Sequence, residues 1–179
     1  MKIKIISLAF GAMLMLFSCT DKSKNAMQQT SVEQQDTAQH TEILDDFSLP
    51  DVQRDFKTLS EEIAKHDMTV IDFWASWCGP CRAEMPNVKA AYEKYKAKGF
   101  NIVGLSFDSK LDSWKKAIAD MQLSWVHLSD LKGWQSLAGQ TYGITSIPAS
   151  YLVAPDGTVI AADLRGDKLE KKLREVYGE

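Results

Sequence analysis

The sequence predicts an α/β fold in which a central, mixed and mainly parallel β-sheet is flanked by helices on both faces. Short apolar segments alternate with amphipathic helical segments along residues 43–179, an order typical of parallel strands joined by helical crossovers. The last two apolar segments, residues 149–153 and 158–164, are joined by the turn Pro155-Asp156-Gly157. They are therefore expected to form a hairpin that adds an antiparallel edge to the sheet.

The first part of this domain is expected to contain short elements. Residues 46–51 and 57–59 are typical of extended segments, and Ser60 is expected to cap a helical stretch over residues 61–65. Residues 68–74 are apolar at nearly every position, as in a strand that is covered on both faces.

A long amphipathic helix is expected after residue 81. Its apolar face is indicated by residues that recur at intervals of three and four: Met85, Val88, Tyr92 and Tyr95. Pro86 lies inside this helix and is expected to bend it. The pair Lys98-Gly99 supplies a C-terminal stop.

The second half of the domain continues the alternation of strands and helices. Strands are expected at residues 100–107, 124–128, 149–153 and 158–164. Helices are expected at residues 112–121, 133–142 and 168–177. With an apolar fraction of 45% in 179 residues, the chain can build one domain with a substantial core.

The chemistry is expected where the strand at residues 68–74 runs into the long helix. There the sequence Cys78-Gly79-Pro80-Cys81 places the second thiol about one helical turn beyond the first. Unpaired N–H groups and the positive end of the helix dipole favour a thiolate at a helix N-terminus. Cys78 is therefore the expected nucleophile and Cys81 the resolving thiol. Pro80 suits the first helical turn, and Gly79 lets a large substrate approach the sulfur.

These residues carry a resemblance to a known family. The pattern Trp-Cys-Gly-Pro-Cys-Arg-x-Glu-x-Pro at residues 77–86 resembles the thioredoxin superfamily, and within it the TlpA/ResA branch. The resemblance covers residues 44–179 and implies a thioredoxin-like fold, with residues 108–128 as the helical insertion of that branch. It also implies a redox-active disulfide between Cys78 and Cys81 and no separate cofactor.

A zinc site is the alternative interpretation of the two cysteines. Zinc requires two further Cys or His ligands at suitable spacing. The remaining candidates are scattered along the chain: Cys19, His40, His66 and His127. The context of the motif therefore favours redox chemistry, and no metal site is expected.

The pair Ile147-Pro148 is expected to form a second part of the site. In the thioredoxin superfamily the corresponding proline is cis and lies beside the Cys pair, and the residue before it binds an extended substrate through its backbone. By this resemblance Pro148 and Ile147 take these roles, and Trp77 shields the disulfide. The alternative is a trans-proline that opens an edge strand, the ordinary state of X–Pro bonds.

Two acidic residues are candidates for tuning the thiols. Asp72 lies in the middle of an apolar strand, where a carboxylate is costly unless its pKa changes or it has a use. In thioredoxins the matching Asp is buried beneath the second Cys and exchanges protons with it; the alternative is an Asp at a hydrated strand end. Glu84 follows Cys81 by three residues, so it lies near the same helix face. It either influences the thiols, as in TlpA/ResA proteins, or only stabilises the helix dipole.

The N-terminal segment is typical of an export signal. Residues 1–18 contain Lys2 and Lys4 and an apolar run over residues 5–17, too short to span a bilayer. The sequence Leu-Phe-Ser-Cys that ends at Cys19 resembles the bacterial lipoprotein box, which implies that Cys19 is lipidated. The alternatives are cleavage near Ser18 with Cys19 free, or a retained anchor.

Residues 19–42 are rich in Gln, Ser and Thr, so they are expected to be a disordered tether or a merely tolerated spacer between the anchor and the domain at residues 43–179. The chain carries 21 basic and 24 acidic residues, and this balance argues against nucleic acid as a partner.

The expected function is thiol–disulfide exchange by a lipid-anchored enzyme of the bacterial cell envelope that faces the periplasm. Gly-Pro between the cysteines resembles reducing thioredoxins more than the oxidant DsbA, so disulfides of exported proteins, including apocytochromes c, are the expected substrates. A reductase in an oxidising compartment also needs a membrane thiol-reductant donor. The alternatives are a disulfide oxidase or isomerase, a thiol peroxidase, whose Pro-x-x-x-Thr/Ser-x-x-Cys setting is missing around Cys78, and a non-catalytic lipoprotein.

Overall fold

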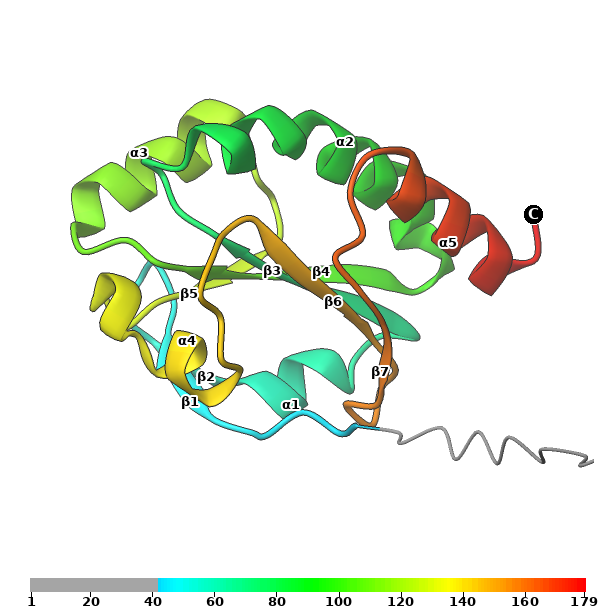
Figure 1. Ribbon diagram of the computed structural model, residues 1–179, viewed down its shortest axis with the longest axis horizontal. Helices are drawn as coiled ribbons and strands as arrows, with labels where there is room; N and C mark the ends of the chain where they lie inside the picture. The colour runs from blue at the N-terminus through cyan, green and yellow to red at the C-terminus, as the bar shows by residue number, and fades with distance from the viewer. Residues whose placement is uncertain (1–41) are drawn as a thin grey trace, which may run out of the picture. The chain divides into compact units, whose positions relative to one another are not determined.

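The computed structural model describes residues 42–179 (Figure 1). The expected export signal at residues 1–18, the lipidated Cys19 and nearly all of the tether lie outside the described residues, and they stay predictions. Within residues 42–179, no helix is long and apolar enough to cross a membrane.

The central sheet has five strands in the order β5-β4-β3-β6-β7. They are β3 (Met68–Trp74), β4 (Phe100–Ser106), β5 (Val126–Leu128), β6 (Ala149–Val153) and β7 (Val159–Ala162). β3 pairs in parallel with β4, and β4 with β5, whereas β6 is antiparallel to both β3 and β7. This arrangement confirms the predicted α/β fold with an antiparallel hairpin at one edge.

Helices cover both faces of the sheet (Figure 1). On one face lie α2 (Gly79–Tyr95), α3 (Leu111–Met121) and α5 (Asp167–Tyr177), and on the other lie α1 (Leu59–Ile63) and α4 (Leu137–Thr141). A small hairpin of β1 (Ser48–Pro50) and β2 (Phe56–Thr58) precedes α1.

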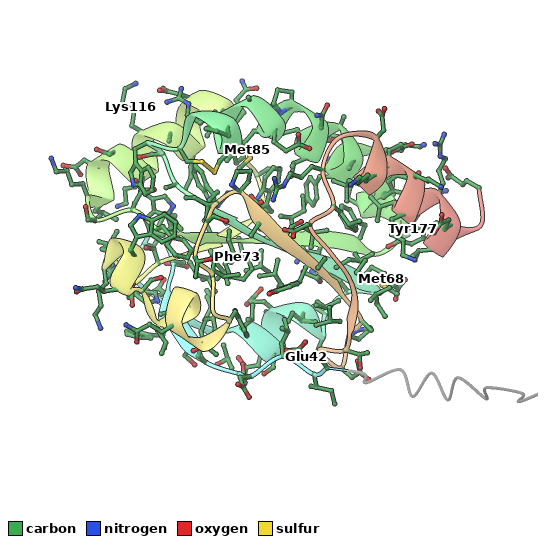
Figure 2. The ribbon with its side chains drawn as sticks, viewed as in Figure 1. Glu42, Met68, Phe73, Met85, Lys116 and Tyr177 are labelled. Carbon is green, nitrogen blue, oxygen red and sulfur yellow. A yellow bond between two sulfur atoms is a disulfide. The ribbon has the colours of Figure 1, made fainter. Side chains whose placement is uncertain are left out.

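The core consists of apolar side chains that lie between these helices and the sheet. Phe73 is fully buried against Tyr142 and Tyr151, with ring centroids 5.8 and 5.7 Å away. Met85 of α2 is also buried (Figure 2). The long helix continues into a 3₁₀ turn over Lys96–Lys98 and stops at Gly99, whose φ of 84° is left-handed, so the predicted stop is confirmed.

The prediction that Ser60 caps α1 is wrong. The helix begins at Leu59, and Ser60 lies in its first turn. The cap comes from a distant residue, because the Asp46 carboxylate accepts hydrogen bonds from the Ser60 N–H at 2.9 Å and the Ser60 hydroxyl at 2.6 Å. An acidic group at a helix N-terminus satisfies unpaired N–H groups and opposes the positive end of the dipole.

The single helix expected over residues 133–142 is also wrong. Residues Gly133–Gln135 form a 3₁₀ turn, the backbone of Ser136 is extended, and α4 then begins at Leu137. The Ser136 hydroxyl accepts a hydrogen bond from the Gly139 N–H at 3.1 Å, so it acts as an N-cap that starts a new helix.

Two strands are shorter than expected. β5 begins at Val126, where pairing with β4 begins, and β7 ends at Ala162. Asp163 has a positive φ of 53°, and its N–H donates to the Ser150 carbonyl at 2.7 Å. The chain therefore leaves the ladder at Asp163 and turns toward α5.

Candidate active site

The two cysteines form a disulfide at the N-terminus of α2. Their Cα atoms lie 5.3 Å apart, and Cys78 is the N-cap residue with an extended backbone. Its sulfur accepts a hydrogen bond from the Cys81 N–H at 3.1 Å. Both cysteines are buried, with Cys78 5% exposed and Cys81 1% exposed. Among residues 42–179, no three His, Cys, Asp or Glu side chains gather as metal ligands.

The surface beside Cys78 is open. A Cβ atom at Gly79 would meet nothing within 4 Å, and Gly79 has no left-handed φ, so the fold itself does not require glycine there. Gly79 and Pro80 are both exposed at the start of α2. An extended chain can therefore approach the sulfur past these two residues, as the sequence predicts.

Asp108, a residue that sequence reasoning missed, holds the turn before Cys78. Its carboxylate is 1% exposed and accepts hydrogen bonds from the Ser76 N–H at 2.9 Å and the Ser76 hydroxyl at 2.5 Å. It also accepts one from the Ser106 hydroxyl at 2.7 Å. Because Ser76 precedes Cys78 by two residues, Asp108 positions the turn that carries Cys78. The signal for it was an acid directly after a buried strand.

Asp72 is buried in the middle of β3, 6% exposed, so the alternative of a hydrated strand end is wrong. Its Oδ2 atom has no hydrogen-bond partner among the described residues. The pKa of Asp72 is raised to about 7, mainly by burial and also by the negative charge of Glu84, whereas the positive charge of Arg165 acts to lower it. Glu84 belongs to the second turn of α2. The Asp72 carboxyl is therefore close enough to the helix that begins at the disulfide for the Glu84 charge to affect its pKa.

Glu84 joins α2 to the start of α5. Its Oε1 atom accepts a hydrogen bond from the Gly166 N–H at 2.6 Å, and its Oε2 atom accepts one from the Asn87 amide at 3.2 Å. Gly166 is the N-cap residue of α5. Glu84 therefore links the two helices, and its negative charge also contributes to the raised pKa of Asp72.

The Ile147–Pro148 peptide bond is cis, as expected. The register pairs Ala149 with Phe73, which places Pro148 beside the carboxyl end of β3, where the chain turns toward Cys78. Ile147 and Pro148 are both half-buried. Pro148 also lines a pocket of about 230 Å³ together with Ile144, Thr145, Ser146, Asp163 and Arg165.

Two tryptophans form an exposed aromatic surface next to the cysteine turn. Trp77 is 54% exposed, and Trp134, which sequence reasoning did not single out, is 49% exposed. Their ring centroids lie 6.1 Å apart, and Trp134 packs edge-to-face on Phe107 at 5.0 Å. Arg82, which follows Cys81 in α2, is exposed.

His127 lies in the same row of the sheet as Asp72, with Gly104 between them. An ideal Cβ atom at Gly104 would lie 2.4 Å from His127 Nδ1, so the absence of a side chain there makes room for the imidazole. Burial lowers the pKa of His127 to about 3. The ring is therefore neutral at physiological pH and carries no charge toward Asp72.

Comparisons with known proteins identify the family of this chain. The model of the AhpC/TSA family matches residues 41–162. The chain is similar to the "Thiol-disulfide oxidoreductase ResA" of Oceanobacillus iheyensis, with 31% identity over 139 residues that cover 71% of this chain and 70% of the relative. The ResA protein of Bacillus thuringiensis is 34% identical over 105 residues, and this match spans 59% of this chain and 58% of the relative.

A solved structure gives the same picture at the level of the fold. The thiol-disulfide oxidoreductase from Bacteroides fragilis superposes with a TM-score of 0.70 at 32% sequence identity. The match covers 75% of this chain and 99% of that structure.

Proposed function

This chain belongs to the AhpC/TSA family of thioredoxin-like proteins, and we propose that it is a thiol–disulfide oxidoreductase. The observation that carries the proposal is the Cys78–Cys81 disulfide at the N-terminus of α2, where Cys78 is flanked by the exposed residues Trp77 and Gly79 and Cys81 is almost fully buried. The names of the relatives and of the solved structure support it.

The reaction is a two-step exchange in which two electrons pass from the protein to the substrate. The Cys78 thiolate attacks one sulfur of a substrate disulfide, which forms a mixed disulfide and releases the first substrate thiolate. The Cys81 thiolate then attacks the Cys78 sulfur and releases the second. The substrate leaves as a dithiol, and the protein returns to the disulfide form.

Asp72 serves the second step. Cys81 is buried and must lose its proton before it can attack Cys78. Because the pKa of Asp72 lies at about 7, its carboxylate can accept that proton near neutral pH. Cys78 does not need this help, because the helix N-terminus favours its thiolate.

Reduction is the proposed direction of exchange. The Gly-Pro pair between the cysteines is typical of reducing thioredoxins, with potentials of about −270 mV, rather than of DsbA at about −120 mV. A midpoint potential of the Cys78–Cys81 pair close to that of DsbA would instead favour an oxidase or isomerase.

The proposed location is the bacterial cell envelope, with the domain facing the periplasm and held to the membrane by lipid on Cys19. The sequence of residues 1–19 supports this, and the substrates would then be disulfides of exported proteins, including apocytochromes c. A membrane thiol-reductant donor would return the protein to its dithiol form. Intact-mass analysis of the mature protein tests the anchor: lipid mass on an N-terminal Cys19 supports it, and an unmodified chain that begins elsewhere contradicts it.

Reduction of insulin disulfides by the full chain, with dithiothreitol as the electron source, tests the proposed activity. Turnover that depends on Cys78 is the expected result. Absence of turnover in the parent protein, or rapid peroxide reduction in its place, would contradict the proposal.

A further inference from the structure

Arg165 is a charged residue that the sequence does not single out, and it lies in the β7–α5 segment, residues 163–166. Its Nη2 atom donates a hydrogen bond to the Pro148 carbonyl at 2.5 Å. The same nitrogen lies 3.3 Å from Oδ1 of Asp163, which is 68% exposed. The guanidinium therefore fixes the loop that carries the cis-proline.

The β7–α5 segment also contacts the strand and the helix that surround Asp72. Ser150 is the residue of β6 that pairs with Asp72, and its hydroxyl accepts a hydrogen bond from the Leu164 N–H at 3.1 Å. At the other end of the segment, the Gly166 N–H donates to Glu84 of α2. The segment thus joins the proline loop, the row of Asp72 and the active-site helix.

The charges that face Asp72 come from two of its neighbouring elements. Glu84 of α2 raises the pKa of Asp72, and Arg165 of the β7–α5 segment lowers it. The residues of β4 and β6 that pair with Asp72 are a glycine and a serine, which carry no charge, and His127 of β5 is neutral. Arg165 is thus the one cation among the causes of the shift.

We propose that Arg165 is a positioning residue with two separable functions in the exchange reaction. Its hydrogen bond holds the Pro148 loop in the shape that receives the substrate. Its positive charge lies on the segment that contacts both Ser150, the β6 partner of Asp72, and Glu84, and there it supports the resolution step. This inference rests on the proposed thiol–disulfide exchange. Without the charge, Asp72 beside Glu84 would hold its own proton to higher pH and could not take another.

Three substitutions separate the charge of Arg165 from its hydrogen bond. Arg165→Lys keeps the charge, Arg165→Gln keeps a donor without the charge, and Arg165→Met keeps neither. The lifetime of the mixed disulfide on Cys78 is measured by acid-quenched single turnover between about pH 5.5 and 8.5, and KM for a protein disulfide is measured in parallel. Lys116→Met, which removes an exposed cation of α3, is the matched control.

The pH midpoint of the resolution step is expected to follow the charge. It moves upward by about half a pH unit in the Gln and Met variants and stays at the parent value in the Lys variant and in the control. KM is expected to follow the donor, with an increase of about threefold in the Met variant only.

The outcomes distinguish this inference from the proposed function. A parent protein without disulfide exchange would overturn the proposed function itself. If exchange is normal and the pH midpoint of resolution is the same in the three Arg165 variants and in the Lys116→Met control, the role of the Arg165 charge is overturned, but the proposed function is not. A midpoint that moves equally in the Lys, Gln and Met variants would show that only the packing of the segment matters, which also contradicts the proposal.

Discussion

The two sulfur atoms of the disulfide lie in opposite surroundings, although only two residues separate them. Cys78 adjoins exposed residues, namely Trp77, Gly79 and Pro80, and the helix N-terminus. Cys81 is almost fully buried, and Asp72 of β3 is a buried carboxyl whose Oδ2 atom has no hydrogen-bond partner among the described residues. The proposed mechanism therefore predicts that attack and resolution are controlled from different sides: backbone dipoles and exposed neighbours serve attack by Cys78, and the buried Asp72 carboxyl serves resolution by Cys81.

The largest effect is expected from exchanging the cysteines one at a time. Cys78→Ser abolishes turnover and capture of partners, because the nucleophile is lost. Cys81→Ser leaves a reactive Cys78 that accumulates mixed disulfides, visible by non-reducing electrophoresis and mass spectrometry. Faster alkylation of Cys81 than of Cys78 in the reduced parent at about pH 7 would reverse the assignment.

Asp72→Asn tests the cost of the buried carboxyl through the stability of the disulfide form. The folded pKa of about 7 lies above the ordinary value of 3.8, so the folded state binds the proton more tightly than the unfolded chain. The stability that this proton contributes is complete below about pH 4 and is lost as the pH rises through 7. Asn mimics the neutral carboxyl at every pH.

The Asn variant should therefore exceed the parent by about 2–4 kcal/mol in free energy of unfolding at pH 8 and match it near pH 4. Urea denaturation of both proteins at the two pH values checks this. An equal difference at both pH values would indicate a packing effect with no contribution from ionisation.

Asp108→Asn should weaken the Cys78 side of the site. The amide introduced by this substitution can accept a hydrogen bond through its one oxygen, but its NH₂ group would face a donor that the Asp108 carboxylate now accepts from. The free energy of unfolding should therefore fall by about 1–3 kcal/mol. The alkylation rate of Cys78 should fall with it, because the turn loses its support. Ser76→Ala removes only the hydroxyl and should lose about half as much free energy of unfolding. An unchanged alkylation rate of Cys78 in both variants would contradict the positioning role of Asp108.

The smallest effect is expected at the exposed aromatic surface. Trp134→Ala should raise KM for a protein disulfide about threefold, because one of two contacting rings is lost, and should leave exchange with a small disulfide unchanged. Phe56→Ala is the matched control, since Phe56 is exposed on β2. An equal change in both variants would remove Trp134 from the substrate surface.

Local sequence signals predicted the centre of the site and most of the fold. The apolar run over residues 68–74, the cysteine spacing and the Gly-Pro pair each act over a few residues, so strand, turn and helix could be placed from the sequence alone. The burial of Asp72 also followed from its apolar neighbours Ile71 and Phe73.

The parts that sequence reasoning missed are contacts between residues far apart in the chain. Asp108 bonds to Ser76 across 32 positions, Arg165 to Pro148 across 17, and Glu84 to Gly166 across 82. In each pair a polar or charged side chain meets a backbone group of a distant residue, and only the fold brings the two together. The wrong cap of α1 has the same cause, because Asp46 is 14 positions from Ser60.

The claim that attack by Cys78 and resolution by Cys81 are controlled separately is tested most directly with Asp72→Asn. The rates of both steps are measured by acid-quenched single turnover across about pH 6–8, and Glu84→Gln is measured in parallel. The account predicts an unchanged rate of attack by Cys78 and a mixed disulfide that lives about tenfold longer than in the parent, most visibly at the acidic end. Simple electrostatics predicts the opposite, because removing a negative charge favours the Cys81 thiolate. An unchanged or shortened lifetime in Asp72→Asn would contradict the account and transfer the proton-accepting role to Glu84.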